Sequence, residues 1–113
     1  MGTRAQIIIK DSCEEVWFYR HSDGYPEGTL PTLEKFLDWV KSGRIRDNAS
    51  QAAGWLVIIG HNEYQISDEP DAEDKIYGWK VSAYEPCSNQ LHSDIDYLYT
   101  IDLEAKTITV KEV

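Results

Sequence analysis

The side chains best suited to catalysis are few in this chain and lie far apart. They are three histidines and two cysteines: His21, His61, His92, Cys13 and Cys87. No histidine has a second histidine four residues away, the spacing by which a helix presents two imidazoles to zinc. Neither cysteine belongs to a CxxC pair or to a nucleophile signature, and no glycine-rich phosphate loop is present. We therefore expect no catalytic residues, no metal site, no cofactor and no enzyme activity.

Acidic side chains are concentrated in one segment, Asp68–Asp74, which holds five carboxylates in seven residues around a central proline. An EF-hand needs a glycine at a fixed place among its oxygen ligands, and this segment has none. So many charges are costly to bury, which predicts an exposed loop. Its acidic residues are candidates for contact with a partner: Asp68, Glu69, Asp71, Glu73 and Asp74.

A second unusual segment is Arg20–Gly28 (RHSDGYPEG), which combines charge, imidazole, phenol and two glycines at the exit of a predicted strand. Loops at sheet edges often carry binding residues. Four side chains are therefore candidates for partner contact: Arg20, His21, Asp23 and Tyr25. As a small-molecule or enzyme site, the segment would use Arg20 to hold an anion and His21 as an acid or base.

The same segment also has a purely structural interpretation as an ordered turn. Gly24 and Gly28 would then take positive φ angles, as glycine does without steric cost. Asp23 would cap the turn, and Arg20 would pair with Glu27.

Charge restricts the classes of partner. Twenty acidic and eleven basic residues among 113 give a net charge of −9, which disfavours direct binding to nucleic acid. The same charge attracts a protein with a basic surface, including one that itself binds DNA or RNA. The alternative is that acidity only keeps the protein soluble.

The length and the apolar pattern predict one cytoplasmic domain, residues 1–113. The longest apolar run, Trp55–Ile59, is too short to span a bilayer, so we expect no membrane contact. The N-terminus shows no signal-like apolar stretch and the cysteines no disulfide spacing, which favours a reducing cytoplasm.

The N-terminal half predicts two strands and a helix. The β-branched and aromatic runs Ala5–Lys10 and Val16–Arg20 favour an antiparallel hairpin. A helix should begin near Pro31, which suits a first helical turn, and end at Gly43. Its apolar side chains recur with helical spacing: Leu33, Phe36, Leu37 and Val40.

The next segment predicts a second helix. Asn48 precedes Gln51 by three residues, as in a capping box, and the helix should run to about Asn62. Because Trp55 and Ile58 make it apolar on much of its circumference, we expect it to be buried between the first helix and the sheet. A strand at Trp55–Ile59 is the competing prediction.

Three strands should follow, at Ile76–Tyr84, Tyr97–Leu103 and Thr107–Val113. The last two alternate apolar and polar residues, as expected when one face of a sheet is buried. The order β-β-α-α-β-β-β segregates strands from helices, which argues against a doubly wound fold. We therefore expect an α+β fold, a twisted antiparallel sheet with two helices packed on one face.

Two stretches of the sequence resemble a known group of proteins. Met1–Arg4 (MGTR) and Tyr19–Gly28 (YRHSDGYPEG) are similar to small proteins of bacteriophages, prophages and bacteria that begin with MGTR and carry DGYP near residue 20. The resemblance covers about the first quarter of the chain. It implies an accessory protein of a phage or mobile element, with no activity attached to the motif.

Three functions are compatible with these features. The first is a non-enzymatic inhibitor or modulator of a basic, nucleic-acid-handling host protein, for instance of the anti-CRISPR type. Full mimicry of nucleic acid would require further acids to line up with the acidic loop: Glu14, Glu15, Asp94, Asp96 and Asp102. The second is a homo-oligomeric accessory module with an open edge at Thr107–Val113. The third is a small-molecule or enzyme site around Arg20 and His21.

Overall fold

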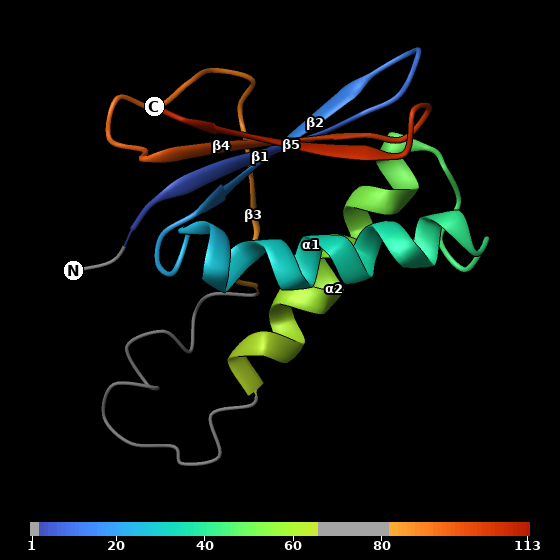
Figure 1. Ribbon diagram of the computed structural model, residues 1–113, viewed down its shortest axis with the longest axis horizontal. Helices are drawn as coiled ribbons and strands as arrows, with labels where there is room; N and C mark the ends of the chain where they lie inside the picture. The colour runs from blue at the N-terminus through green and yellow to red at the C-terminus, as the bar shows by residue number, and fades with distance from the viewer. Residues whose placement is uncertain (1–2, 66–81) are drawn as a thin grey trace.

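The computed structural model describes residues 3–65 and 82–113, which form one sheet with two helices on one of its faces (Figure 1). The elements follow in the predicted order: β1 (Ala5–Lys10), β2 (Glu15–Arg20), α1 (Pro26–Lys41), α2 (Ala49–Gln65), β3 (Glu85–Cys87), β4 (Tyr97–Asp102) and β5 (Thr107–Glu112). The α+β class is confirmed. Within the described residues, neither helix has the length and apolar character needed to cross a membrane.

The strand order across the sheet is β3-β2-β1-β4-β5. Three of the four neighbouring pairs are antiparallel, but β1 and β4 run parallel, with Ile7 opposite Tyr99. The sheet is therefore mixed and not antiparallel throughout. Between β2 and β4 the chain forms the two helices and the short strand β3. It thereby returns to the end of the sheet at which β1 begins, and β4 starts at that same end.

The third strand differs from its prediction. Most of the predicted strand Ile76–Tyr84 lies outside the described residues, and its last three residues precede β3 without belonging to it. β3 is a short edge strand in which Pro86 lies opposite Phe18. A proline fits there because an edge strand leaves one side of its backbone without a partner strand.

Helix α1 begins five residues earlier than predicted. Pro26, and not Pro31, occupies the first helical position, and Pro31 lies inside the helix. Both prolines suit a helix start by type, and the apolar spacing that begins at Leu33 cannot choose between them. The predicted end is confirmed, since Gly43 follows the helix with a φ of 82°.

Residues 49–65 form a helix, as predicted, and not a strand. The Asn48 side chain accepts a hydrogen bond from the Gln51 N–H (3.2 Å), the interaction of an N-cap. The helix is not enclosed, however: Trp55 and Ile58 are 43% and 52% exposed. Its opposite face, with Ala52 and Leu56 fully buried, packs on the sheet.

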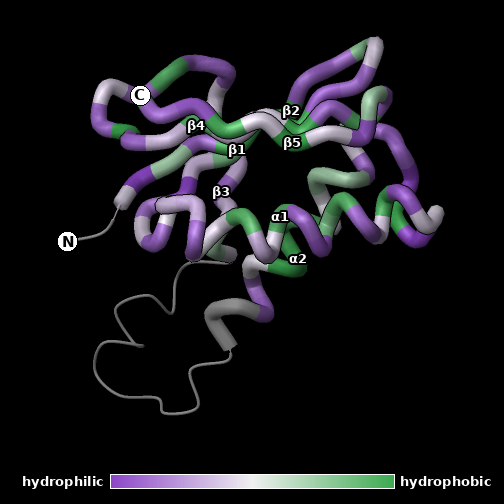
Figure 2. The backbone as a smooth tube through the Cα atoms, in the orientation of Figure 1, coloured by the Kyte–Doolittle hydropathy of each residue, from purple (hydrophilic) through white to green (hydrophobic). Residues whose placement is uncertain are grey.

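One core holds these elements together. Figure 2 shows apolar segments along the middle of the sheet and hydrophilic loops at its ends. The inward residues of β1 and β4, such as Ile7, Ile9, Tyr99 and Ile101, are fully buried in one core that also contains Phe36 of α1. The core therefore lies between the sheet and the two helices.

Candidate functional site

The candidate residues Arg20 and His21 lie on opposite faces of the sheet. Arg20 is buried on the helix side, with its guanidinium 5.0 Å from the centre of the Tyr84 ring. Its Nε donates to the Ser22 carbonyl at 2.8 Å. His21 instead accompanies Tyr19 on the open face, with 3.1 Å between the phenol oxygen and Nδ1. The two side chains cannot act on one small molecule at this loop.

The loop that contains Asp23 and Gly24 ties the start of α1 to the sheet. The Gly24 N–H donates to the Thr3 carbonyl at 2.8 Å, and the buried Tyr99 hydroxyl donates to the Gly24 carbonyl at 2.6 Å. The Asp23 carbonyl accepts a hydrogen bond from the Thr29 hydroxyl at 2.8 Å. These contacts favour the structural interpretation of the segment.

The glycines of this loop serve a different purpose from the one predicted. The residue with positive φ is Asp23 (58°), and neither Gly24 nor Gly28 has one. A Cβ on Gly24 would lie 2.8 Å from the Cβ of Ala5, and one on Gly28 would lie 2.8 Å from the Asp23 carbonyl oxygen. Close approach of the backbone therefore requires both glycines.

Tyr25 occupies the position before the first residue of α1, where its side chain makes no capping hydrogen bond. Its ring is 38% exposed and lies near Gly28. Asp23 is exposed beside it. These two side chains are accessible to a partner, whereas Arg20 is not.

Two histidines that are distant in sequence meet on the open face of the sheet. The ring of Tyr19 lies 5.0 Å from that of His92 and 6.0 Å from that of His21, measured between centroids. Below His92, the fully buried Gln6 side chain accepts a hydrogen bond from the backbone N–H of His92 and donates one to the Gln90 carbonyl, both at 2.9 Å. The cluster holds residues 90–92 against the sheet.

The two cysteines lie in different parts of the sheet. Cys13 is exposed in the β1–β2 turn, and Cys87 is half-buried in β3. Burial raises the pKa of the Cys87 thiol, although a hydrogen bond from Gln6 opposes the shift. Within residues 3–65 and 82–113, no three His, Cys, Asp or Glu side chains are grouped as ligands for a metal ion.

The acidic segment Asp68–Asp74, which was predicted to be an exposed loop, lies outside the described residues. The described acids are nevertheless grouped at one end of the sheet, where the β1–β2 turn, the β4–β5 turn and the start of α2 meet. We call this group the acidic rim, and it consists of Asp11, Glu14, Glu15, Asp47, Asp102 and Glu104. Lys10, which pairs with Glu15 in β2 and with Asp102 in β4, stands in the middle of this rim.

Most carboxylates of the acidic rim are held in place by hydrogen bonds. The Asp11 side chain accepts three backbone N–H groups, those of Cys13 (2.7 Å), Glu14 (2.9 Å) and Ala49 (2.8 Å). These bonds, the one from Ala49 first, lower the pKa of Asp11. Glu14 accepts a hydrogen bond from the Ser50 hydroxyl at 2.6 Å.

Three further acidic side chains of the rim also have partners. Glu15 accepts the indole N–H of Trp17 at 3.0 Å, and Asp102 accepts the N–H of Glu104 at 3.0 Å. Asp47 lies 3.7 Å from the Lys106 ammonium, with both side chains partly exposed. Most of the negative charges of the rim are therefore held in fixed positions.

The five acids expected to line up divide between the two ends of the sheet. Glu14, Glu15 and Asp102 belong to the acidic rim. Asp94 and Asp96 lie at the opposite end, where Asp94 contacts Arg4 at 3.4 Å and Asp96 donates its N–H to the Arg4 carbonyl. A single continuous row of all five is therefore excluded.

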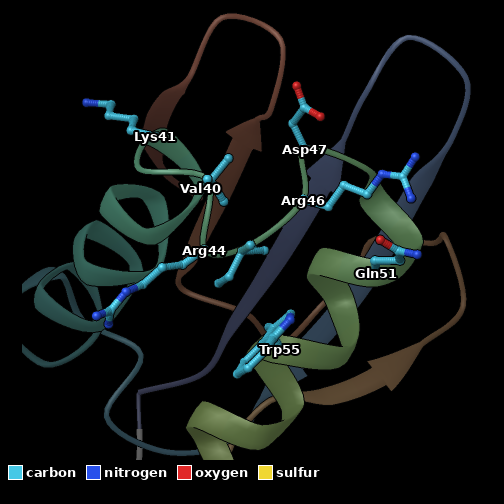
Figure 3. A pocket seen from close by; sticks show the side chains of 9 residues that line it. Val40, Lys41, Arg44, Arg46, Asp47, Gln51 and Trp55 are labelled. Atoms are coloured by element: carbon cyan, nitrogen blue, oxygen red, sulfur yellow. The ribbon is translucent and has the colours of Figure 1, made fainter.

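A shallow hollow of about 570 Å³ lies between the α1–α2 connection and α2 (Figure 3). Lys41, Arg44 and Arg46 line it, and the Trp55 indole forms one wall. Figure 3 shows the three cationic groups pointing in different directions, away from the hollow. They do not converge on one anion, so the hollow lacks the geometry of a phosphate site.

Comparison with protein-family models, with curated proteins and with solved structures finds no match for this chain.

Sequence reasoning missed the acidic rim as a group. Its members come from three separate segments. The pairing of β1 with β2 and β4 brings two of these segments together, and the contacts of Ala49 with Asp11 and of Asp47 with Lys106 add the third. The signal available in the sequence was local: Asp11 and Asp102 each precede a turn, the position at which aspartate caps backbone N–H groups. The parallel β1–β4 pair, which places both turns at one end, had no such signal.

Proposed function

We propose that this protein is a non-enzymatic inhibitor or modulator that docks its acidic rim onto a basic, nucleic-acid-handling protein of a bacterial host. The observation that carries the proposal is that most rim carboxylates are fixed by internal hydrogen bonds at one end of the sheet. Side chains that are already ordered lose little conformational entropy when they bind. Fixed negative charge is complementary to a surface built to receive phosphates.

The mode of action follows from the charge. A protein of net charge −9 is repelled by nucleic acid and attracted by the cationic groove that binds it. Occupation of that groove excludes the nucleic acid. The resemblance of MGTR and DGYP to phage proteins supports a mobile-element setting in the host cytoplasm, in which an effector of antiphage immunity of the CRISPR type is a suitable target.

The test compares two variants of equal net charge. The rim variant removes three charges from rim side chains that do not accept backbone N–H groups, with the substitutions Glu15→Gln, Asp47→Asn and Glu104→Gln. Asp11 and Asp102 are left intact because their carboxylates cap turns. The variant should therefore fold like the wild-type protein.

The matched control removes three charges elsewhere, with Glu27→Gln, Asp38→Asn and Asp94→Asn. Tagged proteins are used to capture partners from bacterial lysate at low and high salt, and the partners are identified by mass spectrometry. We expect the wild-type protein and the control to retain a basic nucleic-acid-binding protein that the rim variant and high salt both release. Equal loss from the control and the rim variant would contradict the proposal, because net charge alone would then explain binding.

A further inference from the structure

The last strand, β5, forms an edge of the sheet. Its only strand neighbour among the described residues is β4. The Val113 N–H donates to the Asp96 carbonyl at 2.9 Å, which fixes the direction of the peptide groups along the strand. Backbone groups alternate in direction along a strand. The N–H and C=O groups of Ile108, Val110 and Glu112 therefore point away from β4.

A groove of mixed polarity runs beside this edge. It lies between α1 and β5 and has a volume of about 620 Å³, and its apolar lining comes from Leu30 and Leu37 of α1 and from Ile108 and Val110 of β5. Ile108 packs against the core, whereas Val110 is 39% exposed. The helix-facing side of the edge is thus left partly uncovered.

The charge around the edge and groove is balanced, unlike that of the whole chain. Three basic and three acidic side chains belong to it: Lys41, Lys106, Lys111, Glu34, Asp38 and Glu112. A strongly basic or acidic partner gains nothing from such a surface. A second copy of this chain, which carries the same local balance, meets this surface without local charge repulsion.

We infer that β5 pairs antiparallel with β5 of a second copy to form a two-fold symmetric dimer with one continuous sheet. In the register that we favour, Thr109 lies on the two-fold axis opposite Thr109 of the other copy. Ile108 then faces Val110 on the helix side. Lys111 faces Thr107 on the open side.

This register satisfies both the backbone and the side chains. The outward peptide groups of Ile108 and Val110 bond to those of the other copy, and Thr109 forms a non-hydrogen-bonded pair. No like charges lie opposite one another across the two strands. A shift by two residues would place Glu112 opposite the apolar Ile108.

The first test uses two substitutions that introduce opposite charges at the same position. Within one copy Thr107 lies opposite Asp102, whereas across the dimer it lies opposite Lys111. Thr107→Lys should therefore favour the folded monomer but weaken the dimer about tenfold, because two Lys–Lys pairs form. Thr107→Glu should tighten the dimer. Glu15→Gln, which changes the net charge as Thr107→Lys does, should leave the dimer unchanged.

Sedimentation equilibrium over a wide concentration range measures the dimer affinity of each variant. Val110→Pro removes an outward N–H without breaking the β4–β5 ladder, so it should abolish the dimer while circular dichroism stays unchanged. A wild-type protein that stays monomeric up to near-millimolar concentration would overturn the inference. Equal affinities for Thr107→Lys and Thr107→Glu would overturn the register.

A disulfide test reports the register directly. In a Cys13→Ser background, Thr109→Cys should form a covalent dimer on mild oxidation, since a non-hydrogen-bonded pair brings Cα atoms to about 4.5 Å. Lys111→Cys should not, because that residue faces Thr107. Cross-linking at 111 and not at 109 would contradict the register. None of the rim substitutions lies in β5, so the two proposals can fail separately.

Discussion

Replacing Tyr99 with phenylalanine tests whether the loop around Gly24 is a structural element. The Tyr99 side chain is fully buried, and its hydroxyl donates to the Gly24 carbonyl at 2.6 Å. Its removal leaves a buried carbonyl without this donor, which costs about 1–3 kcal/mol. With an unfolding entropy of roughly 2.1 cal/mol/K per residue, a chain of 113 residues should melt about 4–13 °C lower.

The assay is thermal unfolding followed by circular dichroism at neutral pH. Tyr97→Phe is the matched control, because Tyr97 lies on the same face of β4 but is only half-buried. Its melting temperature should change by no more than ~2 °C. A Tyr99→Phe protein that melts with the control would refute the role of this hydroxyl in holding the loop.

The same hydroxyl predicts a change in alkaline stability. Burial raises the pKa of Tyr99 to about 12, whereas an unfolded tyrosine titrates near ~10. Below about pH 10 both states are protonated and the stabilisation is complete. As the pH rises toward about 12, the unfolded state ionises first and stability is lost. Tyr99→Phe should lose less stability than the wild-type protein over this range.

Three further predictions concern the ends and the interior of the fold. Gly60→Ala should destabilise the protein by more than ~1 kcal/mol, because a Cβ at this position would clash with Ser82 and Tyr84. Gly54→Ala in the same helix should instead stabilise the protein by about 0.5–1 kcal/mol, because no atom lies near the added Cβ. Urea unfolding measures both changes, and equal effects of the two substitutions would contradict the packing around Gly60. Asn48→Ala should cost about 0.5–2 kcal/mol through loss of the N-cap, and no change in the urea midpoint would exclude that cap. Because the pKa of Asp11 is lowered in the folded state, its stabilisation is present above about pH 4 and is lost in more acidic solution. Asp11→Asn should therefore flatten the acid limb of the stability profile, and an unchanged limb would contradict the capping role.

The sequence predicted the elements better than their arrangement. Local signals were sufficient for the amphipathic helix that ends at Gly43, for the Asn48 cap and for the hairpin of β1 and β2. The parallel neighbour of β1 is a long-range choice, and no local pattern determines it. The start of α1 was misplaced because Pro26 and Pro31 offer the same signal.

The prediction of the candidate sites was limited by the same dependence on long-range strand pairing. Composition singled out the Arg20–Gly28 segment, but strand alternation sends Arg20 to the helix side and leaves His21 on the open face. The count of charged residues showed that the chain is acidic, but it did not show where the acidic side chains gather in the fold. Asp11 and Asp102 come together only after β1 has paired with β4. Proximity of this kind depends on the register of the sheet.

The most direct measurement of the proposed function is competition between this protein and nucleic acid for the captured partner. Fluorescence anisotropy of a labelled oligonucleotide bound to that partner is followed while the wild-type protein, the rim variant or the matched control is added. Displacement by the wild-type protein and the control, and about tenfold or greater weakening for the rim variant, is the predicted result. A complex that holds the oligonucleotide and this protein together would contradict the role of the acidic rim.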